Sequence, residues 1–260
     1  MSIPEAQFTS DDRIAYLTFQ RPEQKNALTW AMYETLVQAC ESVDATPDIS
    51  VFIIRSHGDA FAAGTDIRQF TTFSTGEDGV AYEHRLDAVI DRIERVSVPT
   101  IAQVQGIAAG GGFAIALACD LRVCTPNAQF GMPIGRTLGN CLSAANYARL
   151  IDYIGAARTK ELLLTGRMLD ASEAATLGLI TRVADPAALD AVVADLAGII
   201  AAQAPLTVRS TKEALRRIAQ HRRLPATEAD DLIRACYASN DFREGVAAFL
   251  EKRSPRFSGR

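Results

Sequence analysis

The sequence GIAAGGGFAIALACD, at residues 106–120, joins a β-rich segment to an apolar segment long enough to form a buried helix. Three consecutive glycines, Gly110–Gly112, stand at the junction. Glycine permits a sharp turn and lets a ligand approach the main chain closely. The first amides of a helix lack intrahelical partners and lie at the positive end of its dipole, so they can hold negative charge on a substrate oxygen. A tight turn that packs a helix against a strand is the alternative explanation.

A second glycine loop, FAAGTDI at residues 61–67, follows the apolar segment VFIIRS at residues 51–56. In an open α/β sheet, ligands bind where such loops leave the ends of the strands. Two backbone amides that converge on one carbonyl oxygen form an oxyanion hole, and each donor contributes about 2.7–4 kcal/mol of transition-state stabilisation. The two glycine loops are therefore expected at one end of the sheet.

Strands and helices alternate over the first two thirds of the chain. We predict a strand at residues 13–19, a helix capped by Thr29, an amphipathic helix at residues 77–96 and a buried helix at residues 111–118. From Ala187 onward the pattern is almost entirely helical. This order predicts α/β layers with a mostly parallel sheet, followed by an α-helical C-terminal region.

Composition narrows the class of protein. The chain has 260 residues, is 48% apolar and carries a net charge of −4, which suits one domain with a large core and disfavours nucleic acid or an anionic membrane as a partner. It contains neither a long apolar run nor a signal-peptide pattern, so a cytoplasmic location is expected. The five cysteines and three histidines are scattered, which predicts reduced thiols and no metal site. The sequence contains neither a dinucleotide-binding motif nor a P-loop motif, so no nucleotide cofactor is expected.

Six segments in order carry a specific resemblance. They are RPEQKNALTWAMYETL (21–36), FAAGTDI (61–67), QGIAAGGGFAIALACDLRV (105–123), AQFGMP (128–133), LTGRMLDASEAATLGLITRV (164–183) and FREGVAAFLEKRSPRF (242–257). With these segments the chain resembles the crotonase superfamily, the enoyl-CoA hydratase/isomerase family of acyl-CoA enzymes. Any one motif is weakly specific, but six with plausible spacing cover nearly the whole chain.

The resemblance implies a fold, an assembly and a ligand. The fold would be the crotonase (ClpP-like) spiral of ββα turns over residues 1–195, followed by a helical oligomerisation region over residues 196–260. The protein would form a homotrimer or a hexamer made of two trimers. Its ligand would be an acyl-CoA thioester, with coenzyme A as part of the substrate and no further cofactor.

Carried over residue by residue, the resemblance places the thioester oxygen between the amides of Thr65 and Gly111. Thr65 stands where many relatives have alanine. The threonine leaves the backbone amide intact, and its branched side chain can narrow the tunnel that would hold the acyl-CoA. Lys25 would meet a phosphate of coenzyme A, although a solvated surface lysine is the alternative. The other residues implied in coenzyme A binding are Ala63, Asp66, Ile67, Tyr237, Lys252 and Phe257, the last three near a subunit boundary.

Two glutamates expected of a hydratase are missing. Such enzymes pass the protons of a water across the double bond with two glutamates, and the matching positions here hold Ala114 and Ile134. An aliphatic side chain transfers no proton, and general acid–base steps contribute about 10²–10⁴-fold each. An enoyl-CoA hydratase or isomerase label therefore fits the family, whereas standard hydratase activity is not expected.

Other side chains can border the acyl group. Residues 135–146 offer Arg136, which can recognise a carboxylate or form a surface ion pair, and Asn140. They also offer Cys141, either a nucleophile or a small packing residue, and Ser143. The helix at residues 77–96 offers Glu83 and His84, for which a solvated helix face is the alternative.

The sequence leaves several functions open. The first is an acyl-CoA enzyme that stabilises a thioester enolate and catalyses isomerisation, decarboxylation, C–C cleavage or thioester hydrolysis. The second is a non-catalytic acyl-CoA binder or assembly subunit, which the same two aliphatic residues would suit. A serine-type protease of related fold is disfavoured, because Phe113 and Ala114 stand where its serine is needed.

Overall fold

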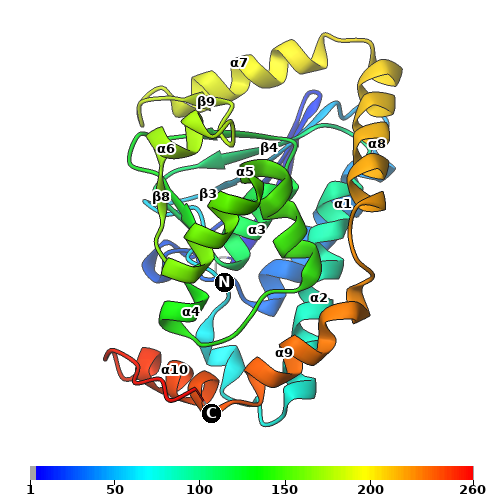
Figure 1. The fold of residues 1–260 in the computed structure, drawn as a ribbon. Helices are drawn as coiled ribbons and strands as arrows, with labels where there is room; N and C mark the ends of the chain where they lie inside the picture. Colours follow the sequence, from blue (N-terminus) through cyan, green and yellow to red (C-terminus); the bar gives the residue numbers. More distant parts are fainter. Residues whose placement is uncertain (1–3, 260) are drawn as a thin grey trace.

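The computed structural model describes residues 4–259. In that range six strands form one sheet in the order β1-β2-β3-β4-β6-β9, parallel except for the β1–β2 hairpin (Figure 1). A smaller sheet has the order β5-β7-β8. The strands are β1 (Ala6–Asp11), β2 (Ile14–Phe19), β3 (Val51–Ser56), β4 (Thr100–Val104), β5 (Ile107–Ala109), β6 (Leu121–Cys124), β7 (Gln129–Gly131), β8 (Leu169–Asp170) and β9 (Arg182–Val183). Strand β1 was not predicted.

Helices cover both faces of the larger sheet. The α-helices are α1 (Trp30–Ala45), α2 (Gly76–Glu94), α3 (Gly111–Ala118), α4 (Ile134–Thr137), α5 (Ala144–Thr165), α6 (Ala171–Thr176), α7 (Leu189–Ala201), α8 (Pro205–His221), α9 (Asp230–Tyr237) and α10 (Asn240–Leu250). Three short 3-10 helices are η1 (Pro22–Gln24), η2 (Ile67–Phe70) and η3 (Ala226–Ala229).

Strand β3 shows why this sheet is buried on both sides. Phe52 and Ile54 belong to the main core, whereas Val51 and Ile53 belong to a second core formed with α7. Alternate side chains of a strand point to opposite faces, so an apolar strand without polar positions needs cover on both. The fully apolar VFII segment therefore fits a central strand.

Local signals fix several helix ends, among them the predicted cap at Thr29. Thr29 caps α1 by accepting a hydrogen bond from the Met32 amide, and Pro205 occupies the first turn of α8. Gly178, just beyond α6, has a positive φ of 76°. Gly155, with φ of 73° and ψ of 161°, is not helical, and it divides α5 at a kink into two helical segments.

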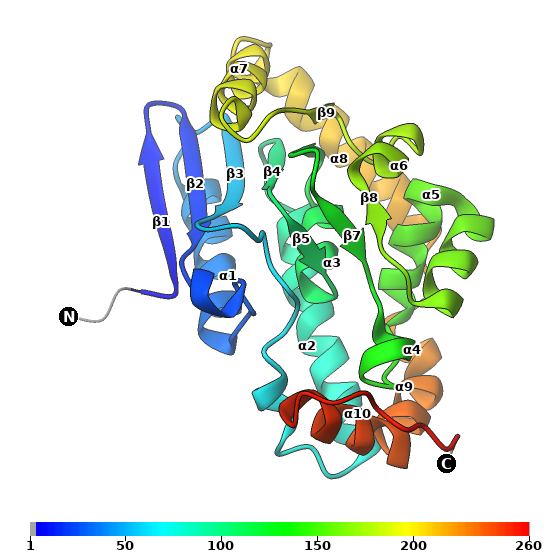
Figure 2. The same cartoon turned by 90° about the vertical axis from the view of Figure 1, so that its left-hand side faces the viewer.

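The domain boundary expected between residues 195 and 196 falls inside α7, whose buried face packs on the sheet. Figure 2 shows α9 and α10 at the end of the molecule where α2 begins, with α7 at the opposite end. No single helix among residues 4–259 is long and apolar enough to cross a bilayer; the bent pair α7–α8 satisfies only the length and composition criteria.

Helix α9 approaches α2 closely at Gly79. A Cβ added to Gly79 would overlap the ring of Tyr237. We expect Gly79→Ala to lower the free energy of unfolding by about 1–3 kcal/mol, because overpacking forces neighbours to move. Gly198→Ala is the matched control: no atom lies within 4 Å of its added Cβ, and alanine in an exposed helix should stabilise by about 0.5–1 kcal/mol. Urea denaturation measures both, and equal effects would contradict the packing argument.

Candidate active site

The two glycine loops meet as expected. Ala62 and Ala108 form a parallel bridge, in which the Ala109 amide donates to the Ala62 carbonyl at 2.9 Å. An added Cβ on Gly110 would lie 3.7 Å from the Cα of Gly64. Gly64 and Gly110 have φ values of 105° and 50°, in the region that favours glycine. The loops therefore touch through main chain, and the positive φ at both glycines would strain a residue with a side chain.

Two backbone amides are left free at this contact. Gly111 is the first residue of α3, so its amide has no intrahelical acceptor. The bridge between Leu28 and Thr65 uses the amides of Leu28 and Asp66 and leaves that of Thr65 unused. Within residues 4–259 neither free amide donates a hydrogen bond. An added Cβ on Gly111 would lie 3.2 Å from Thr65 Oγ1, so the two residues are neighbours.

The hydroxyl of Thr65 links two buried tyrosines beside these amides. Its Oγ1 lies 2.8 Å from the Tyr33 hydroxyl and 2.7 Å from the Tyr82 hydroxyl. Burial raises the pKa of both phenols above their ordinary value, so they are neutral hydrogen-bonding groups. Thr65 therefore joins α1 and α2 through its hydroxyl group, a contact that the sequence did not reveal.

Residues near Lys25 hold the loop at 61–67 in place. Asn26 is fully buried and donates to the carbonyl of Ala60 at 2.7 Å. The carbonyl of Lys25 accepts from the amide of Ala63 at 3.0 Å, while the lysine side chain itself is exposed. Asn26 and the Lys25 main chain therefore fix the loop that carries Thr65.

Asp66 has a mainly structural environment. Its carboxylate pairs with Arg68 at 2.6 Å and Arg21 at 3.3 Å, and it caps η2. The hydrogen bond from Arg68 is the main reason that the pKa of Asp66 is lowered, so the group is ionised. Ile67 is half-buried and packs against the core.

The glutamate positions of a hydratase hold apolar side chains. Ala114 is buried in the first turns of α3, and Ile134 is half-buried at the start of α4. Neither aliphatic side chain can donate or accept a proton in a reaction.

The residues of the 135–146 segment differ in their surroundings. Arg136 is exposed on α4, while Asn140 donates to the hydroxyl of Tyr237 at 3.1 Å. Cys141 is buried, and a hydrogen bond with Cys236, together with burial, raises the pKa of its thiol. This environment favours the packing role over a nucleophile. Ser143 caps α5 and donates to Asp87 at 2.7 Å, which is a structural role.

His84 and Glu83 do not share a solvated face. His84 is half-buried and bonds Asp230 of α9 at 2.7 Å. Glu83 is 1% exposed and accepts a hydrogen bond from Tyr237 at 2.6 Å. The interpretation of Glu83 as solvated is therefore wrong. Glu83 lies three residues after Val80 and seven before Ile90, on the apolar face of α2. This helical spacing is the sequence signal that it is buried.

The three C-terminal residues implied in coenzyme A binding do not lie alike. Tyr237 is 2% exposed, and its hydroxyl points to Glu83 and Asn140 rather than to the surface. Lys252 is exposed, with a φ of 55°, and Phe257 is 39% exposed. The Tyr237 hydroxyl is thus turned into the protein, and of the three residues only Lys252 and Phe257 are exposed.

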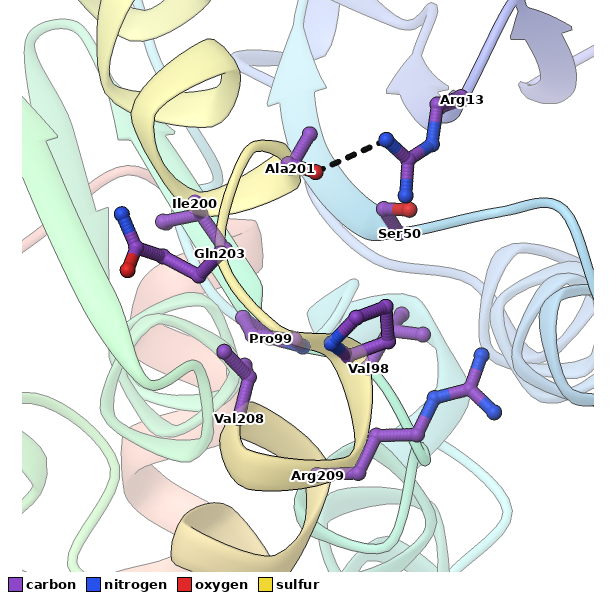
Figure 3. A pocket seen from close by; sticks show the side chains of 10 residues that line it. Arg13, Ser50, Val98, Pro99, Ile200, Ala201, Gln203, Val208 and Arg209 are labelled. Atoms are coloured by element: carbon purple, nitrogen blue, oxygen red, sulfur yellow. Dashed lines mark hydrogen bonds between the residues drawn. The ribbon is translucent and has the colours of Figure 1, made fainter.

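Two hollows lie away from the glycine loops. One, between the sheet and the α7–α8 junction, has a volume of about 20 Å³ and is lined by residues such as Arg13, Val98 and Val208 (Figure 3). That volume suits about one water molecule. The other is an open groove of about 710 Å³ between α10 and residues 253–258. Among residues 4–259, no group of three or more His, Cys, Asp or Glu side chains is placed to hold a metal ion.

A family model for enoyl-CoA hydratase/isomerase matches residues 9–260. The chain belongs to this family, and so to the crotonase superfamily. A probable mitochondrial enoyl-CoA hydratase 2 from Arabidopsis thaliana is 35% identical over 255 residues, covering 96% of this chain and 83% of the relative. An enoyl-CoA hydratase/carnithine racemase from Magnetospirillum magneticum matches with a TM-score of 0.80 at 35% identity, covering 100% of this chain and 97% of the other.

The crotonase fold is also that of a methylmalonyl-CoA decarboxylase solved with 2-nitronate-propionyl-CoA. That structure matches with a TM-score of 0.90 at 28% identity, and each chain is covered over 100% of its length. The crotonase superfamily member described here therefore has relatives named for more than one reaction.

Proposed function

We propose that this crotonase-family chain is an acyl-CoA enzyme that holds a thioester enolate between the amides of Thr65 and Gly111. The observation that carries the proposal is the pair of unpartnered amides where the two glycine loops touch. An enolate forms on the thioester oxygen, and fixed amides beside a helix N-terminus stabilise that charge without reorganisation. A methylmalonyl-CoA decarboxylase of the same fold, solved with an acyl-CoA analogue, supports a coenzyme A thioester as the ligand.

The coenzyme would lie outside this hole. Lys25, Lys252 and Phe257 are exposed, so they are available to its phosphates and adenine. We also propose a homotrimer, or a hexamer of two trimers, working in the cytoplasm. The apolar side chains exposed on and just after α8, among them Leu206, Leu215 and Leu224, support an assembly role for the C-terminal region.

The reaction is proposed to differ from standard hydration. We expect the wild-type protein to hydrate crotonyl-CoA very slowly, because losing each glutamate removes about 10²–10⁴-fold. Loss of the enoyl thioester absorbance measures the rate. The variant Ala114→Glu/Ile134→Glu is expected to gain activity if it folds. Fast hydration by the wild-type protein would contradict the argument from Ala114 and Ile134.

A panel of thioesters then tests the proposed function itself. It contains a 3-enoyl-CoA for isomerisation, malonyl-CoA and methylmalonyl-CoA for decarboxylation, a 3-oxoacyl-CoA for C–C cleavage and butyryl-CoA for thioester hydrolysis. Mass spectrometry of the products identifies turnover, and calorimetry measures binding. Turnover of at least one member supports an enzyme. Tight binding without any turnover favours the alternative, a non-catalytic acyl-CoA binder.

A further inference from the structure

Helix α2 places one buried acid beside the candidate site without a cationic partner. Glu83 is 1% exposed, and within residues 4–259 its carboxyl forms no ion pair. It accepts hydrogen bonds from two neutral donors, the Tyr237 hydroxyl at 2.6 Å and the Ser143 amide at 3.2 Å. A buried carboxyl that lacks a cation is costly for a fold to keep, which makes its position informative.

A second buried acid on the same helix shows the contrast. Glu94 pairs with Arg149 at 2.9 Å and Arg223 at 2.6 Å. Burial alone would raise the pKa of Glu94, but these hydrogen bonds outweigh it and lower the pKa to about 2. For Glu83, burial dominates over the Tyr237 hydrogen bond and raises the pKa to about 8. When the pKa values of two glutamates are shifted to opposite sides of pH 7, the two residues serve different functions. Of this pair, only Glu83 is suited to exchange a proton near pH 7.

Two tyrosines link Glu83 to the residue that carries one of the free amides. Its chain neighbour Tyr82 ends at Thr65 Oγ1, 2.7 Å away, and Thr65 supplies one of the amides. The ring of Tyr82 packs 6.1 Å, centroid to centroid, from the ring of Tyr237, which bonds Glu83. The carboxyl and the amides therefore border one buried cluster of aromatic side chains.

We propose that Glu83 transfers the proton at the carbon next to the thioester carbonyl, with Tyr237 positioning its carboxyl group. This inference rests on the proposed function, because it needs a thioester held by Thr65 and Gly111. It supplies the proton-transfer group that Ala114 and Ile134 cannot provide.

The step balances without a further reactant. The Glu83 carboxylate takes a proton from the α-carbon, and the C–H electron pair forms the C=C bond of the enolate. The former carbonyl electrons become the negative charge on the oxygen, which the two amides hold. In the return step the Glu83 carboxyl gives its proton back to carbon, at the same position or at one conjugated with it.

The groups that face Glu83 set its ionisation. Its own helix contributes Tyr82 and Asp87, and Asp87 raises the pKa of Glu83 further. Tyr237 from α9 lowers that pKa through its hydrogen bond. The remaining titratable neighbours are Tyr33 of α1, Tyr147 of α5 and Cys141 of the preceding loop.

Exchange of α-protons in D₂O tests the proposal independently of the final reaction. The wild-type protein is incubated with acetyl-CoA, butyryl-CoA or octanoyl-CoA, and mass spectrometry follows deuterium in the acyl group. Since the carboxylate removes the proton, the rate should rise as pH increases through about 8. Glu83→Gln should lower the exchange rate by about 10²–10⁴-fold and abolish this pH dependence, while calorimetry shows unchanged thioester binding.

Two further variants separate proton transfer from folding. Tyr237→Phe removes a hydrogen bond that lowers the pKa of Glu83, so the rise in rate should move to higher pH. Asp87→Asn, one helical turn from Glu83, removes a charge that raises that pKa. With Asp87→Asn, the rise in exchange rate should occur at lower pH, and the rate at high pH should equal that of the wild-type protein. A residue with only a structural role would not move the pH profile in these opposite directions.

The outcomes distinguish the two proposals. If the wild-type protein exchanges protons and Glu83→Gln retains the rate and the pH profile, the role of Glu83 is wrong and the enolate function stands. If the wild-type protein binds a thioester but exchanges no proton with any of the three, the role of Glu83 is wrong, and turnover in the thioester panel decides the enolate function. If it neither binds nor turns over any thioester, the enolate function is wrong as well.

Discussion

Removal of the Gly111 amide proton is expected to lower kcat by about 10²–10³-fold on any thioester that the protein turns over. Proline lacks this proton, and it is tolerated at the first residue of a helix, which Gly111 occupies in α3. A Cβ at residue 111 would overlap the Tyr33 hydroxyl, so the test uses Gly111→Pro in a Tyr33→Phe background.

The control is Gly111→Ala in the same Tyr33→Phe background. It adds the same Cβ and keeps the amide proton, so the two variants differ in the hydrogen-bond donor and in the proline ring that replaces it. Steady-state kinetics on a thioester from the panel gives kcat for both, and circular dichroism checks that both are folded. Equal kcat values in two folded variants would show that this amide holds no charge in the transition state.

The largest expected effect on stability comes from Arg149. Its side chain is 2% exposed and lies between Glu94, at 2.9 Å, and Asp87, at 3.8 Å. Arg149→Met should lower the free energy of unfolding by about 3–5 kcal/mol, because the Asp87 carboxyl then loses its neighbouring guanidinium and Glu94 keeps only Arg223, at 2.6 Å, as a partner. Arg95→Met is the control: the pair of Arg95 with Asp91 is solvent-exposed, and such pairs contribute about 0–1 kcal/mol.

The loss at Arg149 should depend on pH. The pKa of Glu94 is about 2 in the fold and near 4.5 ordinarily, so its ion pairs stabilise the fold fully above pH 4.5. That contribution disappears as pH falls from 4.5 towards 2, and the difference between the wild-type protein and Arg149→Met should shrink. Urea denaturation at pH 7 and pH 3 measures it. A difference that stayed constant would mean that packing, not charge, dominates at Arg149.

Local features of the fold could be predicted because their causes are local. Thr29 caps α1 and Gly178 follows α6, each through interactions within a few residues, and the apolar VFII segment of β3 favours a strand covered on both faces. The helix at residues 111–118 has the predicted bounds, since an apolar segment after three glycines leaves few alternatives. Strand β1 was missed: its burial pattern is mostly exposed, so it lacks the alternation that identified β2.

The part of the candidate site that could be predicted is the part formed by main-chain atoms of the two glycine loops. The two glycine loops could be paired from the sequence because parallel strands bring their ends together, and the loops do touch. Ser143 and Cys141 could not be judged in advance. A cap on α5 and a thiol–thiol contact depend on which helices pack against them.

The sequence by itself determined the family, the layered fold, the two glycine loops and the absence of glutamates at positions 114 and 134. All of these are properties of residue type and spacing. Only the tertiary structure decided that Glu83 is a buried acid and that Tyr237 bonds it. These two residues are 154 positions apart in the chain, and they meet because α9 packs onto α2 at Gly79. Burial and hydrogen bonding set the pKa of a carboxyl, and both depend on contacts that no local pattern contains.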